Sequence, residues 1–418
     1  MLGLGLGISY RGGGGPRPAL DLNFLGSVLD SRLAFTRAST ATYFNSLGVL
    51  TSAATDAARF DYNPATLAAR GLLLEEARTN TLLQSNTFAT APWSGTATVA
   101  TGAVTAPDGT ASLTLTDSSA VALQNRSQTI TVVSGTTVYT GSIYLKAGTS
   151  SVASLRFTLT GATGVSGEVV VDLTNGLAQW RTSNVGTSFS ITSVGNGWYR
   201  VTSTITDNNT GNTSLGFDLR PAFAATYSPT ADVTAMGSVN AFGGQVEVGA
   251  FATSYIPSTT IAVARAVDVC SALVSAFAFN ADEGALSVAC TPVGVGAGLQ
   301  TAVYLDDGTS NERMGVRASS ATNAILAVDG GATQTSVSIG TLVAGTAFKA
   351  AFAYRLNDMA GVMSGGTVQL DTTCTLPTVT KLLIGTRLTG SESLTGWYTR
   401  AAYYNKRLSD ATLIRIIT

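Results

Sequence analysis

Histidine is absent from this chain of 418 residues, and only 12% of the residues are charged, against about 25% in an average globular domain. The missing imidazole excludes Ser-His-Asp and Cys-His mechanisms, histidine general bases and zinc sites that depend on imidazole ligands. Proline is also scarce, at 10 residues beside 45 glycines, so the chain lacks the composition of a disordered or collagen-like protein. We therefore expect a folded protein without a histidine proton shuttle.

Net charge and long apolar runs are missing as well. The 24 basic and 25 acidic residues leave a net charge of -1, which gives no electrostatic reason to expect nucleic-acid binding. The longest apolar runs, such as residues 71–74, fall far short of the roughly 20 residues of a membrane-spanning helix, so we expect no membrane insertion. The mean hydropathy of +0.27 comes from Ala, Val and Leu among Thr, Ser and Gly, which suits sheets with a neutral, hydroxylated face.

Cysteine occurs only three times, at Cys270, Cys290 and Cys374. Three scattered cysteines do not make a disulfide framework, and an odd count leaves at least one thiol free. We expect all three to be small buried residues of strands, with a Cys270–Cys290 bridge as the alternative.

Glycine dominates the first 20 residues, where it alternates with leucine and then forms the run 12–15. This segment lacks the basic and continuous apolar stretches of a secretory signal, and it lacks the lysine and strand-to-helix context of a phosphate-binding loop. We predict an extended docking arm over residues 1–20 that adds a strand to a partner surface. Its docking side chains would be Leu2, Leu4, Leu6, Ile8, Tyr10 and Arg11.

Alternation of apolar and hydroxyl residues is the main secondary-structure signal beyond the arm. It predicts an N-terminal β segment over residues 21–84, and then short strands that recur with Gly, Asn and Asp turns over residues 85–262, as in a β-sandwich. A second such series covers residues 263–418 and ends in one short helix capped by Ser409. The predicted fold is all-β, with tandem antiparallel sandwiches of the jelly-roll type.

Three stretches resemble a known family. They are LAFTRASTATY (33–43), GLLLEEARTN (71–80) and VEVGAFATSYIP (246–257), and they are similar to phrases in head-spike and tail-fibre proteins of tailed phages and gene transfer agents. In that family the first two phrases precede a carbohydrate-binding-module-like sandwich and the third closes it. The region after residue 266 resembles, more loosely, a concanavalin-A-like or laminin-G-like jelly roll.

The resemblance implies a virion structural protein that is not an enzyme. It would project from the virion surface as a head spike or tail fibre, bind capsid, portal or tail proteins through the arm, and contact host-surface polysaccharide. Fibres of this kind suggest a homo-oligomer, with a trimer as the first expectation. Two alternatives remain open: a polysaccharide depolymerase that uses acidic pairs such as Asp306, Asp307 or Glu283, and a free bacterial adhesin.

Aromatic side chains beside polar ones are what a sugar-binding face requires, because sugar rings stack on flat apolar planes. Trp180, which is followed by Arg181, is the first candidate platform, and Tyr199 and Trp93 are further candidates. Trp198 and Trp397 each follow a glycine at the start of a strand pattern, so we expect them to anchor cores.

A dense polar cluster contains Glu75, Glu76 and Arg78. Adjacent residues of a strand point to opposite faces, so the two glutamates cannot readily flank one glycosidic bond. We expect one of them to form an ion pair with Arg78 or Arg37 that ties the N-terminal segment to the sandwich.

Two Asp-Gly segments, residues 306–308 and 329–331, raise the question of calcium. Asp-Gly is a strong turn signal, and neither segment has the spaced acidic ligands of a calcium loop. We expect turns, with Asp306 and Asp307 as the alternative calcium ligands, and no other cofactor.

Overall fold

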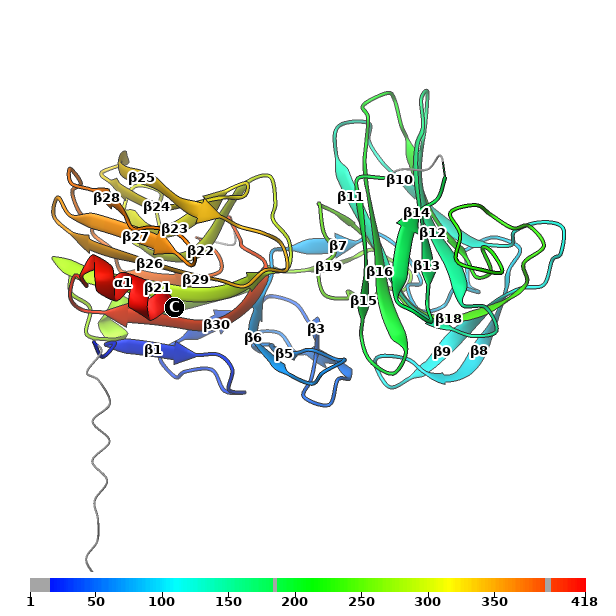
Figure 1. Cartoon of the computed structure of the whole chain (residues 1–418), viewed down its shortest axis with the longest axis horizontal. Helices are drawn as coiled ribbons and strands as arrows, with labels where there is room; N and C mark the ends of the chain where they lie inside the picture. Colours follow the sequence, from blue (N-terminus) through cyan, green and yellow to red (C-terminus); the bar gives the residue numbers. More distant parts are fainter. Residues whose placement is uncertain (1–15, 183–185, 388–391) are drawn as a thin grey trace, which may run out of the picture.

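The computed structural model describes residues 16–182, 186–387 and 392–418. It consists of two β-sandwiches that lie side by side (Figure 1). In the described residues the only helical segments are a 3-10 turn, η1 (Val274–Ala276), and α1 (Asp410–Ile417). The prediction of an all-β fold of antiparallel sandwiches with one short C-terminal helix is therefore confirmed.

The sandwich on the right of Figure 1 contains β8 (Thr98–Thr105), β9 (Ala111–Asp117), β10 (Arg126–Thr131), β11 (Val138–Ala147), β12 (Val152–Thr160), β13 (Val165–Asp172), β14 (Leu177–Trp180), β15 (Ser188–Ser193), β16 (Trp198–Thr206), β17 (Ser214–Arg220) and β18 (Gly237–Val248). One sheet has the order β10-β17-β12-β13-β14 and the other β15-β16-β11-β18-β9-β8. Their shared core contains Leu155, Phe157, Val201 and Phe217, and all its fully buried members lie between residues 82 and 246. This unit therefore buries its own core.

The other sandwich contains β1 (Leu20–Asn23), β2 (Ala34–Thr36), β5 (Phe60–Tyr62), β6 (Ala69–Leu74), β20 (Val269–Leu273), β21 (Glu283–Pro292), β22 (Leu299–Asp306), β23 (Arg313–Ser319), β24 (Thr322–Asp329), β25 (Ala332–Thr341), β26 (Phe348–Arg355), β27 (Met359–Met363), β28 (Gln369–Asp371), β29 (Lys381–Ile384) and β30 (Gly396–Tyr404). Its first sheet has the order β28-β27-β26-β21-β30-β6-β5, and β1 also pairs with β30. The second has the order β2-β20-β29-β22-β23-β24-β25.

The strands β1, β2, β5 and β6 belong to this second sandwich, whereas the sequence suggested a separate N-terminal segment over residues 21–84. β1 pairs with β30 in the register Leu20↔Tyr403, and β6 pairs with the start of β30. Phe35 and Leu72 are buried in the same core as Phe352. Hydrophobic alternation marks a strand but not its partner, so the sequence could not show pairing across such a long separation. We call residues 16–80 and 263–418 the base sandwich, and residues 81–262 the inserted sandwich.

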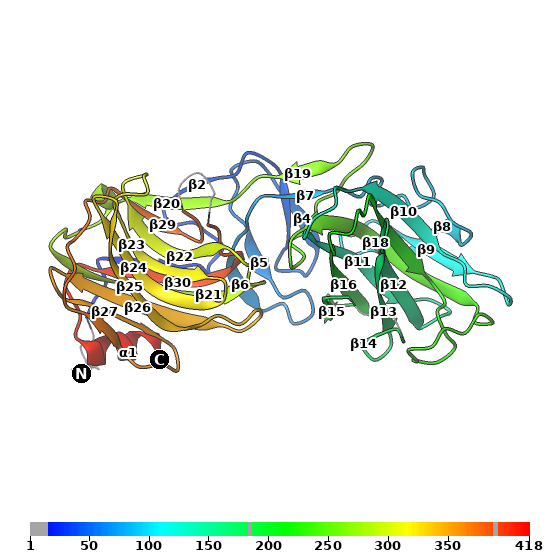
Figure 2. The same cartoon turned by 90° about the horizontal axis from the view of Figure 1, so that it is seen from above.

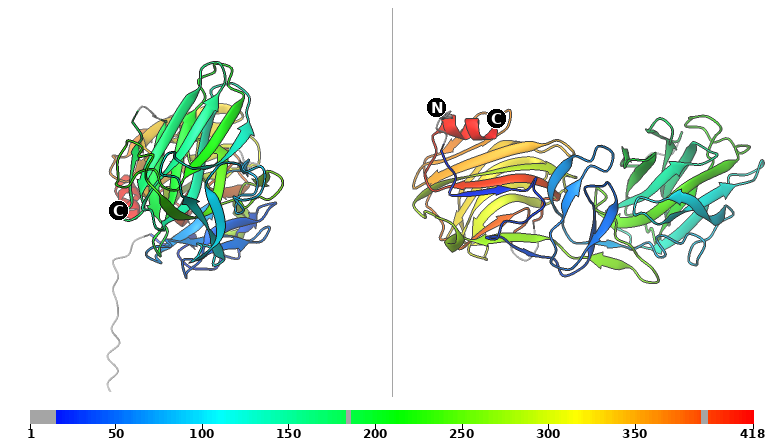
Figure 3. Two further views of the ribbon diagram at one scale, coloured as in Figure 1. Left: turned by 90° about the vertical axis from the view of Figure 1, so that its right-hand side faces the viewer. Right: turned by 90° about the horizontal axis from the view of Figure 1, so that it is seen from below.

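Two short ladders join the sandwiches (Figures 2 and 3). β7 (Arg78–Asn80) and β19 (Val263–Arg265) pair with each other where the chain enters and leaves the inserted sandwich. The hairpin of β3 (Ala41–Phe44) and β4 (Leu50–Ala53) packs Phe44 and Leu50 against Trp198 of the inserted sandwich. The two sandwiches are therefore connected through packed side chains as well as through the chain itself.

The C-terminal helix begins as expected, because the Ser409 side chain accepts a hydrogen bond from the backbone N–H of Thr412. Leu413 and Ile417 are buried in a cluster with alanines of β26 and β27. Within the described ranges, no helix is long and apolar enough to cross a membrane.

All three cysteines are free and buried. Cys270 lies on β20 and Cys290 on β21, which belong to different sheets, and both thiols occupy the core of the base sandwich. The prediction of buried, unbridged cysteines is confirmed, and the Cys270–Cys290 bridge is not formed. Cys374 is not on a strand, contrary to expectation, but lies in the loop after β28.

The pairing of β1, β2, β5 and β6 predicts which fragments fold. Residues 263–418 alone lack four strands and would expose the core that Phe35 and Leu72 cover, so we expect no cooperative thermal unfolding by circular dichroism. Residues 16–80 joined to 263–418 by a short glycine linker should unfold cooperatively, because Asn80 and Val263 are paired neighbours. Residues 81–262 alone should also do so.

A cooperative transition of residues 263–418 at the same temperature as that of the joined fragment would contradict this assignment of the N-terminal strands.

Candidate functional site

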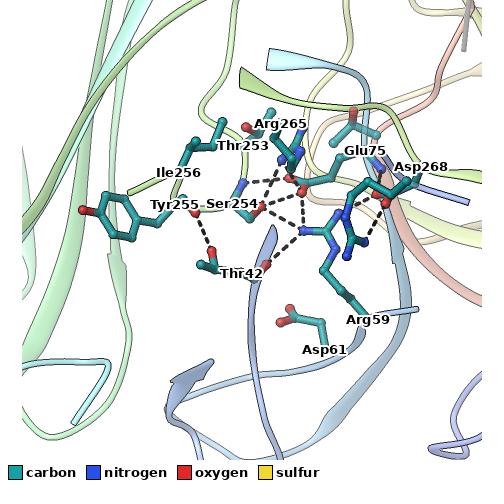
Figure 4. A network of polar contacts seen from close by, with 12 residues as sticks. Thr42, Arg59, Asp61, Glu75, Thr253, Ser254, Tyr255, Ile256, Arg265 and Asp268 are labelled. Carbon is teal, nitrogen blue, oxygen red and sulfur yellow. Dashed lines mark hydrogen bonds and ion pairs between the residues drawn. The ribbon is translucent and has the colours of Figure 1, made fainter. Parts of the chain in front are cut away.

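A network of buried ion pairs lies where the chain crosses between the sandwiches (Figure 4). Glu75, directly after β6, accepts a hydrogen bond from Arg59 Nη1 at 2.6 Å and another from Arg265 Nη1. Arg59 Nη2 also donates to Asp268 Oδ2 at 2.5 Å. At most 1% of each of these four side chains is exposed to solvent. Four charged groups in a water-free position are stable only because each faces an opposite charge.

Backbone and hydroxyl groups complete the network. Asp268 accepts hydrogen bonds from Arg37 Nη1 at 3.1 Å and from the Glu75 backbone N–H at 2.8 Å. The backbone N–H and the hydroxyl of Ser254 donate to Glu75 at 2.7 and 2.6 Å. Ser254 follows β18 of the inserted sandwich, whereas Arg37 and Asp268 belong to the base sandwich. The network therefore joins the two sandwiches.

The charge state of Glu75 follows from these contacts. Burial by itself raises the pKa of a carboxyl group, but the cations Arg265 and Arg59 and the hydrogen bonds from Ser254 lower the pKa of Glu75 to about 2. Both carboxylate oxygens already accept hydrogen bonds from the protein. Glu75 is thus an ionised structural group with no oxygen free to protonate or attack a sugar.

One of the two alternative ion pairs expected from the sequence is present. Glu76 pairs with Arg78, as expected, and it is more exposed than its buried neighbour Glu75. Arg37 pairs with Asp268 rather than with a glutamate. Arg59, Arg265 and Asp268 were not singled out in the sequence, because single charged residues in three separate segments give no local signal.

The aromatic residues proposed as sugar platforms do not form one exposed surface. Trp93 is buried, with Nε1 donating to the carbonyls of Leu83 and Gln84, each at 3.0 Å. Trp180 packs edge-on against Phe189, with ring centroids 5.0 Å apart. The two residues lie on β14 and β15, which are edge strands of the two sheets of the inserted sandwich.

The other two candidates, Arg181 and Tyr199, also contact neighbouring residues. Arg181 pairs with the buried Glu168 at 2.8 Å, and Tyr199 lies against Gly176, where an added Cβ would be 2.8 Å from the ring. Alternation shows which residues share a face, but not which face another part of the chain covers. Trp180, Arg181, Tyr199 and Trp93 therefore do not meet on one open surface, and their role in sugar binding stays a prediction.

A cleft of about 500 Å³ lies between the two sandwiches. One wall is the outer face of β15, β16 and β11. The opposite side is formed by Trp397 of β30, Tyr43 and Arg70 of the N-terminal segment, and the loop at residues 344–345 of the base sandwich. Phe251, in the segment that leads back to the base sandwich, also lines the cleft. No local pattern in the sequence marks this site, because it exists only where the two sandwiches meet.

Hydroxyl groups cover the wall that the inserted sandwich contributes. Ser190 and Thr202 are cross-strand partners whose hydroxyl oxygens lie 2.7 Å apart. Thr204 adds a further hydroxyl to the lining, and its oxygen lies 2.9 Å from that of the buried Thr140. Residues 200, 202 and 204 face the cleft, whereas Val201 and Ile205 enter the core. A hydroxylated face, expected from the composition, is present here, and Arg200 is the charged residue on it.

The opposite wall holds an aromatic ring in a fixed orientation. Trp397 Nε1 donates to Asp61 Oδ2 at 2.8 Å, and the Arg70 guanidinium lies over the indole, with Cζ 4.5 Å from the ring centroid. Burial raises the pKa of Asp61, although a hydrogen bond from the Phe44 backbone N–H and the charge of Arg70 act in the opposite direction. Trp397, expected to anchor a core, is instead half-buried at the cleft wall.

The acidic residues considered for calcium binding or depolymerase chemistry lie outside the cleft lining. Asp306 Oδ1 accepts from the Gly308 N–H at 3.0 Å, and Asp307 Oδ1 accepts from the Thr309 N–H at 2.7 Å, as in turns. Glu283 Oε2 accepts from the Arg407 N–H at 3.2 Å. Nowhere in the described parts of the chain do three or more acidic or cysteine side chains gather as metal ligands.

The remaining candidates belong to the docking arm. Leu2, Leu4, Leu6, Ile8, Tyr10 and Arg11 lie outside the described residues.

Comparisons with known proteins give only weak likenesses. No family model and no curated protein matches the chain. The Ruminococcus gnavus IT-sialidase CBM40 bound to α2,3 sialyllactose is 13% identical over 33% of this chain and 84% of that one, with a TM-score of 0.29.

Two other solved structures are similarly distant. Domain 4 of AbnA, a GH43 extracellular arabinanase from Geobacillus stearothermophilus in complex with arabinotriose, is 9% identical over 40% of this chain and 82% of that one (TM-score 0.28). Trypanosoma rangeli sialidase in complex with the inhibitor DANA is 12% identical over 73% of this chain and 60% of that one (TM-score 0.30). Values this low establish no relationship, so neither ligand nor activity follows from them.

The buried network predicts a large effect of Glu75→Ala. Removal of the carboxylate leaves Arg59 and Arg265 buried without one of their counter-charges, so we expect a loss of about 3–5 kcal/mol in the free energy of urea unfolding at neutral pH. Asp21→Ala is the control, because it breaks the exposed Asp21–Arg400 pair and should cost less than about 1 kcal/mol.

The same network gives stability a defined pH dependence. The pKa of Glu75 is about 2 in the folded chain and 4.5 for the ordinary group, so its contribution is complete above about pH 4.5 and is lost as the pH falls toward 2. Glu75→Gln should show a shallower loss of stability over this interval than the wild type. Equal slopes for the two proteins would show that Glu75 is not the group responsible.

Proposed function

We propose that this chain is a non-enzymatic structural protein on the surface of a tailed-phage or phage-like particle, and that its cleft binds host-surface polysaccharide. The cleft between the sandwiches carries this proposal, because it combines the hydroxyl-covered face of β15, β16 and β11 with the fixed indole of Trp397. Aromatic planes and hydroxyl groups are the partners that a sugar ring and its own hydroxyls require. The volume of about 500 Å³ is in the range of known ligand sites.

The arrangement of the chain is compatible with attachment at one end and binding at the other. β1 begins beside Tyr403, whereas the sandwiches meet beside Gly396 at the opposite end of β30. β1 thus begins at the end of the base sandwich remote from the inserted sandwich (Figure 1), and we propose that this end faces the particle. We propose capsid, portal or tail proteins as the docking partners, and a homo-oligomer, first of all a trimer, as the assembled form.

The state of the acidic groups at the cleft favours binding over hydrolysis. A glycosidase needs one carboxyl group to protonate the leaving oxygen and another to act as nucleophile or base. Glu75 is ionised and enclosed by arginines, and Asp61 accepts hydrogen bonds from Trp397 and from the Phe44 backbone. Neither of these carboxyl groups is therefore placed as a free acid beside a bound sugar.

Blocking the cleft should reduce host binding. Ser190 is exposed on the edge strand β15, so Ser190→Trp would place an indole in the cleft without disturbing a core. We expect particles that carry this variant to adsorb to host cells at least about 10-fold more slowly. Thr129→Trp, at an exposed position of the opposite edge strand β10, is the matched control and should leave adsorption unchanged.

Equal adsorption of the two variants would contradict the role of the cleft. Release of new reducing ends from purified host polysaccharide by the wild-type protein would contradict the non-enzymatic assignment and favour a depolymerase.

Deletion of residues 1–17 tests attachment separately. The truncated chain keeps β1 and both sandwiches, so we expect it to fold but to be absent from purified particles, as judged by immunoblotting. Assembly of the truncated chain at normal occupancy would show that the arm is not the docking element.

A further inference from the structure

One cation in the cleft lacks a counter-charge. Arg200 of β16 faces the cleft and donates from Nη2 to the Ser142 hydroxyl at 2.9 Å. Its guanidinium lies over the Tyr144 ring, with Cζ 5.3 Å from the centroid. Arg200 Nε is buried without a hydrogen-bond partner. Among the described residues, no carboxylate lies within 4.0 Å of Arg200.

The other arginines at this junction are matched with carboxylates. Arg59 and Arg265 contact Glu75, and Arg37 contacts Asp268. Arg70, across the cleft, lies 3.5 Å from Asp61. A partly buried guanidinium with unused donors is costly unless an anion compensates it. Arg200 therefore differs from its neighbours by a missing anion.

The surroundings of Arg200 define the kind of anion that fits. Thr192 is its cross-strand partner on β15, and the hydroxyls of Ser190 and Thr202 lie on the next row of the same face. Guanidinium groups bind carboxylates and sulfates through paired N–H donors, and the adjacent hydroxyls can bond to the hydroxyls of a sugar ring. A charged group attached to a sugar would use both features together.

We infer that the cleft binds an acidic polysaccharide, with Arg200 as the residue that receives the carboxylate or sulfate of the sugar. This inference rests on the proposed glycan-binding function and specifies its ligand class. Selectivity then comes from the unpaired guanidinium, whereas the hydroxyl face and Trp397 accept neutral parts of the polymer. Binding should weaken at high salt, because ionic contacts at an open cleft are screened.

The test compares charged and neutral forms of one polymer. Polygalacturonate and its methyl ester share one backbone, but the ester carries a neutral methyl-capped carboxyl group in place of each carboxylate. Dextran sulfate and dextran form a second pair for sulfate. Biolayer interferometry with the full chain should give at least about 10-fold tighter binding to one acidic polymer than to its neutral counterpart. Arg200→Gln should abolish this preference.

Two further variants separate charge recognition from general effects. Arg156→Gln removes an equivalent charge from β12 in the opposite sheet, where Arg156 Nε donates to the Ser166 hydroxyl, and the preference should remain. Thr192→Glu leaves Arg200 in place but supplies a carboxylate from its cross-strand partner, and the preference should disappear. This exposed substitution provides the test even if Arg200→Gln does not fold.

The outcomes distinguish this inference from the proposed function. If the wild type binds a neutral polymer as tightly as its acidic counterpart, the acidic class is wrong but glycan binding stands. If Arg156→Gln loses the preference as fully as Arg200→Gln or Thr192→Glu, the attraction is nonspecific and Arg200 is not the receiving residue. If no polymer binds and Ser190→Trp leaves adsorption unchanged, both the inference and the proposed function are overturned.

Discussion

The ion pairs that Glu75 forms with Arg59 and Arg265 hold together the point where the chain passes from one sandwich to the other. Ser254, at the exit of the inserted sandwich, donates two hydrogen bonds to the same carboxylate. Buried ionised side chains are stable only beside specific partners of opposite charge, because moving either partner leaves a buried charge unpaired. This constraint fixes the orientation of the inserted sandwich on its base, and with it the shape of the cleft.

The insertion explains why the cleft has two chemically different walls. The base sandwich supplies an indole oriented by Asp61 and Arg70, and the inserted sandwich supplies rows of hydroxyl groups from adjacent strands. The Arg59 and Glu75 side chains, which belong to the network, lie beside the segments that carry Asp61 and Leu73 of the cleft lining. The buried network is therefore continuous with the lining of the cleft.

Sequence patterns predicted elements far better than they predicted neighbours. The alternation in residues 198–206 indicated a strand, and the position of Trp198 after a glycine indicated a core residue, as found. The same alternation could not reveal that Trp180 faces Phe189, nor that Trp397 lies across a cleft from Arg200. These neighbours depend on which segment of the chain packs on each face of a sheet. A periodic pattern shows only which residues share a face, not which segment packs on it.

The sequence by itself determined the all-β class, the buried thiols, the short final helix and the hydroxylated character of the exposed strands, because each follows from local periodicity and composition. Only the tertiary structure decided that residues 16–80 complete the base sandwich, that three arginines surround two carboxylates, and that Arg200 remains without one. The physical reason is that strand pairing and charge pairing join residues hundreds of positions apart, and the free energy of those contacts belongs to the folded arrangement rather than to any single segment.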